Sequence, residues 1–219
     1  MLGELLPAAV RVAERPDDDP AAVPLAEEVE VVARAGAGRR GEFLTGRACA
    51  RRALARFGVP PVAIPRGPDR APRWPAGFVG SITHCRGYRG AAVARRADLL
   101  AVGVDAEPHR PLPPRVAERI LLPAERRWLR GQPPGSALDT VFFSAKESVY
   151  KVWHPVTGRW LGFRDALVRL DAADDSALAG VAGTFSVELL VPAPDCLRGI
   201  AGRFRVADGL VLTAATVPA

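Results

Sequence analysis

Two carboxylates stand two positions apart in the segment LLAVGVDAE, residues 99–107. Side chains alternate along a β-strand, so Asp105 and Glu107 would share one face, roughly 7 Å apart along the strand. Ala101 and Gly103 fall on the same face, and Gly103 would keep it open beside the acids. Such a pair suits Mg²⁺, which takes oxygen ligands and completes its shell with waters and substrate phosphates. The alternative is an edge strand whose acidic end is solvated, and the spacing leaves both interpretations open.

A second group of chemically capable residues lies in FFSAKESVYKVW, residues 142–153. Glu147 and Lys151 are four apart, so they share one face of a helix. If that helix packs on the strand at 99–107, Glu147 becomes a third carboxylate, and three acids held together cannot comfortably stay ionised without a bound cation. The alternative is a surface salt bridge worth about 0.3–0.5 kcal/mol. The opposite face is an apolar stripe that predicts packing on a core: Phe142, Ala145, Val149, Val152 and Trp153.

Phosphate-binding residue types occur in two further segments. WPAGFVGSITHC, residues 74–85, reads as a strand that ends in Thr83 and His84, where a hydroxyl, an imidazole and free backbone amides could hold a phosphate. The alternative for His84 is a structural histidine. Several arginines recur at helical intervals upstream, and they suit either a phosphate or a solvated face: Arg39, Arg40, Arg47 and Arg51.

The composition is that of an ordinary globular protein with a basic balance. The 219 residues carry 30 Lys and Arg against 24 Asp and Glu, a net charge of +6. Only Lys146 and Lys151 are lysines, and the other 28 are arginines. No apolar run approaches the roughly 18 residues of a membrane span, and the N-terminus reads poorly as a signal peptide. Three scattered cysteines form neither a disulfide framework nor a metal motif, which favours the cytoplasm.

The elements that position these residues alternate without a regular βαβ rhythm, which predicts an α+β fold. A proline-rich loop is expected over 59–75, and the Asp208–Gly209 pair predicts a hairpin turn. Helices are expected at 27–57, 115–130 and 139–153. Strands are expected at 77–83, 91–94, 99–107, 168–170, 184–191, 200–206 and 210–217.

Taken together, WPAGFVGSITHC, VGVDAE and FSAKESVYK, followed by HPVTGRWLGF, resemble the single-chain 4′-phosphopantetheinyl transferase family of the surfactin- and enterobactin-synthetase type, in its actinobacterial-like subgroup. The resemblance implies two similar α+β halves related by a pseudo-twofold axis. Residues 1–103 would form the N-terminal half with the coenzyme A nucleotide-binding residues, and 104–219 the C-terminal half with the metal site and the catalytic helix. The implied reaction moves the 4′-phosphopantetheine arm of coenzyme A onto a serine of an apo carrier protein and releases 3′,5′-ADP.

The resemblance also implies roles for individual residues. Glu147 and Lys151 are the expected catalytic residues, as general base and as pyrophosphate contact. The expected metal is Mg²⁺, with Mn²⁺ as the alternative, on Asp105, Glu107 and Glu147 and on the backbone carbonyl of Ala106. Coenzyme A is expected to contact a wider set: Arg39, Arg47, Arg66, Thr83, His84, Asp105, Glu147 and Lys151.

Three positions depart from the family pattern. Phe143 stands where many members have Trp, Arg70 where the first motif has Gly, and Ala71 where some members have Lys. For the last two, the neighbouring Arg66 or Arg73 could supply the positive charge in that loop.

The implied partners are apo acyl, aryl or peptidyl carrier proteins, of fatty-acid, polyketide or peptide-synthetase type, with an acidic face that a +6 protein would attract. The segment 111–122 is the expected docking surface, or else an amphipathic helix packed on its own domain. A monomer is expected, with no nucleic acid and no membrane as partner. Two alternatives from other classes are a basic nucleic-acid-binding module, which lacks a recognition motif here, and a metal-dependent phosphodiesterase using the same acids.

Overall fold

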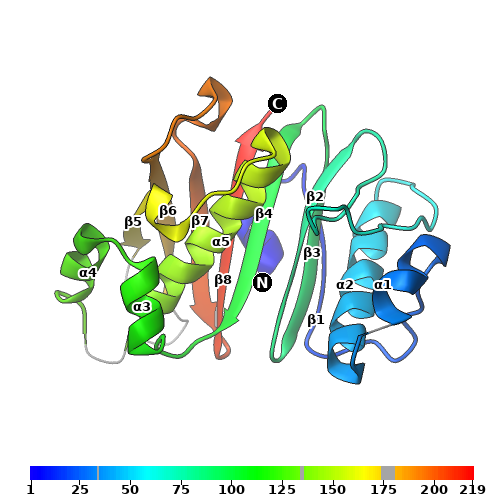
Figure 1. The fold of residues 1–219 in the computed structure, drawn as a ribbon, viewed down its shortest axis with the longest axis horizontal. Helices are drawn as coiled ribbons and strands as arrows, with labels where there is room; N and C mark the ends of the chain where they lie inside the picture. The colour runs from blue at the N-terminus through cyan, green and yellow to red at the C-terminus, as the bar shows by residue number, and fades with distance from the viewer. Residues whose placement is uncertain (34, 134–135, 174–180) are drawn as a thin grey trace.

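The computed structural model describes residues 1–33, 35–133, 136–173 and 181–219. Two antiparallel sheets lie side by side, and a long helix covers one face of each (Figure 1). The α+β class predicted from the sequence is confirmed. No described helix is long and apolar enough to cross a membrane.

The N-terminal sheet has the strand order β1-β3-β2, from β1 (Arg11–Arg15), β2 (Phe78–Cys85) and β3 (Tyr88–Arg95). The helix α2 (Ala37–Ala55) packs on it through small apolar residues such as Cys49 and Ala53, both fully buried. The single helix predicted over 27–57 is wrong, because a separate short helix α1 (Val29–Ala33) precedes α2. The strand β1 was not predicted. The proline-rich segment 59–75 holds neither helix nor strand, as predicted.

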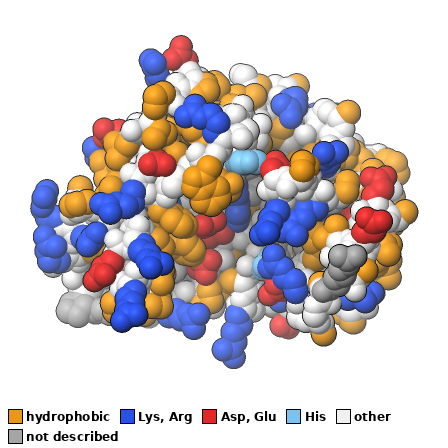
Figure 2. All heavy atoms as spheres, in the orientation of Figure 1, with side chains coloured by type: hydrophobic (Ala, Val, Ile, Leu, Met, Phe, Trp, Pro, Cys, Tyr) orange, Lys and Arg blue, Asp and Glu red, His pale blue; other side chains and the backbone are white. Residues whose placement is uncertain are grey.

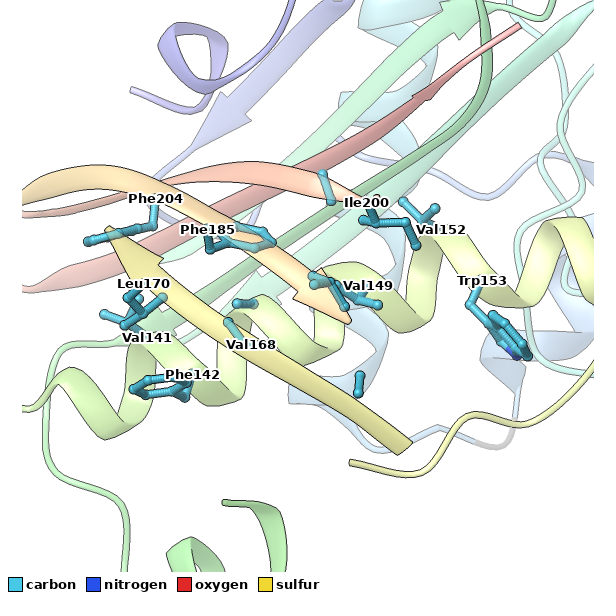
Figure 3. Close-up of a cluster of buried hydrophobic side chains, with 14 of the residues drawn as sticks. Val141, Phe142, Val149, Val152, Trp153, Val168, Leu170, Phe185, Ile200 and Phe204 are labelled. Carbon is cyan, nitrogen blue, oxygen red and sulfur yellow. The ribbon is translucent and has the colours of Figure 1, made fainter. Parts of the chain in front are cut away.

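The C-terminal sheet has the order β4-β8-β7-β6-β5. Its hairpin β7–β8 turns through Asp208 and Gly209, both at positive φ, as the sequence predicted. The helix α5 (Leu138–Thr157) covers the sheet, and its Phe142, Val149 and Trp153 belong to one buried cluster with aromatic and branched side chains of the strands. Figure 3 shows Val149 of this helix facing the sheet strand that carries Phe185. The strands are β4 (Leu99–Pro108), β5 (Ala166–Ala173), β6 (Ala182–Leu189), β7 (Ala201–Ala207) and β8 (Leu210–Pro218).

The helix predicted over 115–130 is two short helices, α3 (Pro114–Ile120) and α4 (Pro123–Leu129). The break has a local cause, because the residue before a proline avoids the helical region. Leu122 precedes Pro123 and is extended, at φ −71° and ψ 157°. The remaining described helical turns are 3₁₀ helices: η1 (Leu2–Leu5), η2 (Ala26–Glu28), η3 (Phe163–Asp165) and η4 (Asp195–Leu197).

The two sheets meet where their edge strands β2 and β4 run side by side in the same direction (Figure 1). Side-chain hydroxyls of β2 join them to the backbone of β4. Ser81 Oγ accepts a hydrogen bond from the Val104 amide (3.1 Å), and Thr83 Oγ1 accepts one from the Ala106 amide (3.0 Å). The strand β4 pairs with β8 from Leu99 onward, and the division of the chain after residue 103 stays a prediction.

Gly103 sets the distance between β4 and α5. A Cβ at this position would lie 2.0 Å from the backbone oxygen of Ser148. The prediction that Gly103 keeps the face beside the acids open is therefore wrong, because α5 occupies that space. The missing side chain of Gly103 instead lets α5 approach β4 closely enough for Lys151 and Ser144 to reach the strand.

Candidate active site

A cleft of about 1000 Å³ lies between the two halves. Its N-terminal wall is built by α2, β2 and the proline-rich segment, and its other wall includes α5. Figure 2 shows acidic side chains in this hollow and basic ones along its N-terminal side. Of the residues predicted for the site, six line it: Arg39, Arg47, Arg66, His84, Glu147 and Lys151.

Asp105, beside this cleft, accepts three hydrogen bonds from other side chains. It is buried on β4, and its Oδ2 accepts a hydrogen bond from Ser144 Oγ at 2.8 Å. Its Oδ1 accepts from Lys151 Nζ at 2.8 Å and from Thr83 Oγ1 at 3.3 Å. Lys151 Nζ also donates to the Val104 carbonyl at 2.8 Å. The strand and the helix thus fix one carboxylate and one ammonium group in direct contact, from residues 46 positions apart.

The other two acids are electrostatically coupled to Asp105. Burial, followed by the charge of Asp105, raises the pKa of Glu107 to about 7, and Glu147 adds to the shift. Burial and Asp105 also raise the pKa of Glu147, while Lys151 opposes both shifts. These carboxyl groups therefore hold protons more readily than ordinary glutamates.

The predicted metal ligands are Asp105, Glu107, Glu147 and the backbone carbonyl of Ala106. Within the described ranges, no group of three His, Cys, Asp or Glu side chains is placed to hold a metal ion. Ala106 is fully buried, and its amide donates to Thr83. The predicted metal ligands stay a prediction.

Thr83 and His84 lie differently although they are adjacent on β2. Thr83 is buried and bridges the two sheets, and it is not among the described residues that line the cleft. Its predicted contact with coenzyme A stays a prediction. His84 faces the cleft, with Nδ1 3.5 Å from Glu42 Oε2. Burial lowers the pKa of His84, and the positive charges of Arg39 and Lys151 lower it further.

Arg47 is the most firmly held of the predicted arginines. It is only 6% exposed, its Nε donates to the Ile64 carbonyl at 2.7 Å, and its guanidinium stacks 4.3 Å from the centre of the Phe43 ring. Burial lowers its pKa to about 10, so it stays charged at neutral pH. Arg39 and Arg66 are exposed at the edge of the same cleft.

The two lysines of α5 have opposite environments. Lys146 is 3% exposed, lies 3.0 Å from Glu125 Oε2, and donates to three backbone carbonyls, including those of Phe163 and Ala166. Lys146 is therefore structural, whereas Lys151 lines the described cleft.

Sequence reasoning missed an aromatic group at one end of the cleft. The Tyr150 ring lies 5.1 Å from that of Trp160 and 5.5 Å from that of His154. His154 Nδ1 lies 3.6 Å from Asp69 Oδ2, across the cleft. A signal was available, because positions 147, 150, 151 and 154 fall on one helical face.

Two family descriptions match the chain. Residues 27–94 match the 4′-phosphopantetheinyl transferase N-terminal domain, and residues 101–191 match the 4′-phosphopantetheinyl transferase superfamily.

Three curated proteins are similar over most of their length. The chain is 45% identical to the 4′-phosphopantetheinyl transferase Npt of Nocardia iowensis over 221 residues, which is 98% of each chain. It is 47% identical to the 4′-phosphopantetheinyl transferase Svp of Streptomyces mobaraensis over 209 residues, 92% of this chain and 82% of that protein. It is 45% identical to the 4′-phosphopantetheinyl transferase PptT of Mycobacterium tuberculosis over 223 residues, 98% of this chain and 96% of that protein.

A cleft with a basic wall opposite a helix that carries Glu147 and Lys151 is suited to a phosphorylated substrate. The chain belongs to the 4′-phosphopantetheinyl transferase family, whose members transfer the phosphopantetheine group from coenzyme A onto carrier proteins. The family, the fold class and the enzyme class predicted from the sequence are confirmed.

Proposed function

We propose that this enzyme transfers the 4′-phosphopantetheine arm of coenzyme A to a serine hydroxyl of an apo acyl, aryl or peptidyl carrier protein and releases 3′,5′-ADP. The observation that supports this most directly is the single cleft of about 1000 Å³ that joins the arginines of the N-terminal half to Glu147 and Lys151. Residues 1–103 would bind the nucleotide, and residues 104–219 would carry the metal site and the catalytic helix.

The arginine wall suits the 3′-phosphate of coenzyme A. Arg47 uses Nε for the Ile64 carbonyl, which leaves its two terminal nitrogens for a phosphate in the cleft. Arg39 and Arg66 would add charge at the rim, and the planar fork of arginine matches phosphate oxygens. The 3′-phosphate lies away from the reacting phosphorus, so binding it serves to orient coenzyme A for the reaction. His84 and Thr83 would contact the same substrate from the end of β2.

The chemistry would take place at α5. The carrier serine must lose a proton as it attacks, and Glu147 would accept it directly or through a water, a role worth typically 10²–10⁴-fold. Its raised pKa makes it a stronger base than an ordinary glutamate. An ammonium group has three donors, and two of those of Lys151 are used by Val104 and Asp105. The third would contact a pyrophosphate oxygen and stabilise the departing nucleotide phosphate.

The donor set of the site fits a divalent cation. Asp105, Glu107 and Glu147 are oxygen donors whose charges oppose one another, and Mg²⁺ favours such ligands. Mn²⁺ is the alternative, and the Ala106 carbonyl is a further candidate ligand. When bound, Mg²⁺ would offset the negative charge of the diphosphate.

The carrier would dock through an acidic face, for which the net charge of +6 is favourable. Within the segment 111–122, Val116 is 38% exposed, whereas Ile120 and Leu121 are buried in the core. Docking would therefore use the outer side of α3 around Val116, and part of the segment serves its own domain. We further propose that the enzyme is cytoplasmic, since its three cysteines are free thiols, and that it acts as a monomer.

The test measures the mass of a carrier protein before and after incubation with the enzyme. A panel of apo carriers incubated with coenzyme A and Mg²⁺ should gain about 340 Da on the serine, the mass of the transferred arm. Asp105→Ala should abolish the gain while the circular dichroism spectrum stays native. Hydrolysis of phosphodiesters with no mass gain on any carrier would favour the phosphodiesterase instead.

A further inference from the structure

Glu28 is a fully buried carboxylate outside the cleft. It ends the short helix η2 and is 0% exposed. Its Oε2 accepts a hydrogen bond from the Leu25 amide at 3.0 Å, and its Oε1 accepts one from the Ile64 amide at 2.9 Å. Arg51 on α2 donates to both oxygens, at 2.8 and 3.0 Å. Glu28 therefore fastens η2, α2 and the start of the proline-rich segment to one another.

Ile64 connects this carboxylate to the cleft. Its amide is held by Glu28, and its carbonyl accepts the hydrogen bond from Arg47 Nε at 2.7 Å. Ile64 is itself 0% exposed, so its peptide groups depend on these protein partners. The orientation of the Arg47 guanidinium is thus set by a carbonyl whose own position Glu28 sets.

The C-terminal half contains the same arrangement around Glu125, which is 2% exposed. Its Oε2 accepts from the Leu122 amide at 2.7 Å and lies 3.0 Å from Lys146 Nζ, and its Oε1 accepts from the Val168 amide at 2.9 Å. Each glutamate thus holds the amide three residues before it, a cation on the long helix, and the amide of a following segment. The two differ one step further out. Ile64, which Glu28 holds, accepts from the cleft residue Arg47, whereas Lys146, which Glu125 holds, donates to Ile120, Phe163 and Ala166, none of which lines the described cleft.

We propose that Glu28 is a positioning residue for the 3′-phosphate of coenzyme A, acting through Ile64 on Arg47. Glu28 does not touch the substrate. It keeps the terminal nitrogens of Arg47 aimed into the cleft, while the Phe43 ring supports the guanidinium from one side. This inference rests on the proposed function, in which Arg47 binds that phosphate.

The test compares coenzyme A with 3′-dephospho-coenzyme A as donor. Glu28→Gln keeps the shape of the side chain, but its amide nitrogen cannot accept a hydrogen bond, so the Leu25 or the Ile64 amide loses its acceptor. Arg51 also loses the charge that holds Glu28 and, through it, Ile64 in place. We expect the KM for coenzyme A to rise about tenfold, because displacing a substrate-orienting group by a fraction of an ångström is costly. The KM for the dephospho donor and the kcat for both donors should stay within twofold. A purely structural role would alter both donors equally.

Glu125→Gln is the matched control. It removes an equivalent buried charge, so we expect a similar fall in Tm with the wild-type preference for coenzyme A retained. In an Arg47→Gln background, Glu28→Gln should cause no further loss of preference, because coupled residues act non-additively. If Glu28→Gln does not fold, Glu28→Asp retains the charge but shortens the reach to Ile64, and the preference should fall in the same way.

The outcomes separate this inference from the proposed function. A folded Glu28 variant with the wild-type donor preference, beside an Arg47→Gln variant that has lost it, overturns the positioning role alone. A wild type that uses both donors equally well overturns the Arg47 assignment and this inference with it. Absence of transfer to every carrier overturns the proposed function itself.

Discussion

Replacing Gly103 with alanine tests how the site depends on the distance between β4 and α5. The new Cβ would lie 2.0 Å from the Ser148 backbone oxygen, whereas ordinary contact begins at 3.4 Å. The opposing atom is backbone and cannot rotate away, so helix and strand must separate by about 1.4 Å. The 2.8 Å contact of Lys151 with Asp105 would then exceed hydrogen-bond length.

The energetic consequence follows from two effects. Overpacking a tight interface costs about 1–3 kcal/mol, and weakening a charge-assisted hydrogen bond adds about 1.5–3 kcal/mol. We expect a total near 4 kcal/mol, which for a chain of this size lowers Tm by about 8–16 °C. Misplacement of reacting groups by about 1 Å costs about 100-fold in rate, so kcat should fall by that factor in the folded fraction.

The assay measures carrier modification by mass at a temperature where the variant is fully folded, and Tm by circular dichroism. Gly3→Ala serves as control, because a Cβ at Gly3 meets nothing within 4 Å and the residue is exposed. The control should match the wild type in both measurements. A Gly103→Ala variant with wild-type Tm and kcat would refute the account of this interface.

Three further results are expected. Glu147→Gln should abolish transfer without unfolding the protein. In the wild type, kcat should fall as the pH decreases, because the base must be deprotonated to act. The apparent pKa of this fall should lie above that of an ordinary glutamate. Arg47→Ala should raise the KM for coenzyme A more than it lowers kcat, and equal wild-type KM values for coenzyme A and its dephospho form would contradict this. Tyr88→Phe should lower the stability at pH 7 by about 2 kcal/mol, because Tyr88 donates to Glu14 at 2.5 Å. Burial raises the pKa of Glu14, but the hydrogen bonds from Tyr88 and the N-terminus lower it below 4.5 overall, so the Tm difference should disappear as the pH falls through that folded pKa.

The sequence predicted elements where a pattern was local. The alternation in residues 99–107 placed β4, and the apolar stripe of residues 142–153 placed α5. The predicted helix and strand boundaries were wrong where a single residue or a short charged segment breaks the surrounding pattern. Leu122, which precedes Pro123, is extended and separates α3 from α4. The strand β1 has five residues, three of them charged, and carries too little apolar periodicity to be recognised.

The sequence indicated candidate residues for the site, whose roles stay predictions, but it did not indicate the contacts among them. Residue types and spacing identified Asp105, Glu147 and Lys151, yet the pairing of Lys151 with Asp105 depends on how closely two distant elements approach. Whether Lys146 or Lys151 is buried depends on which face of the helix packs on the core. The sequence did not indicate that the buried Glu125 would form an ion pair with Lys146.

The junction between β2 and β4 carries a mechanical consequence. A continuous ladder of backbone hydrogen bonds would make the two sheets one rigid sheet. Here the groups that join them include the side-chain hydroxyls of Ser81 and Thr83. A change in the distance between β2 and β4 would therefore stretch these side-chain hydrogen bonds. Since Thr83 also donates to Asp105, the same change would shift the Asp105 carboxylate beside the cleft.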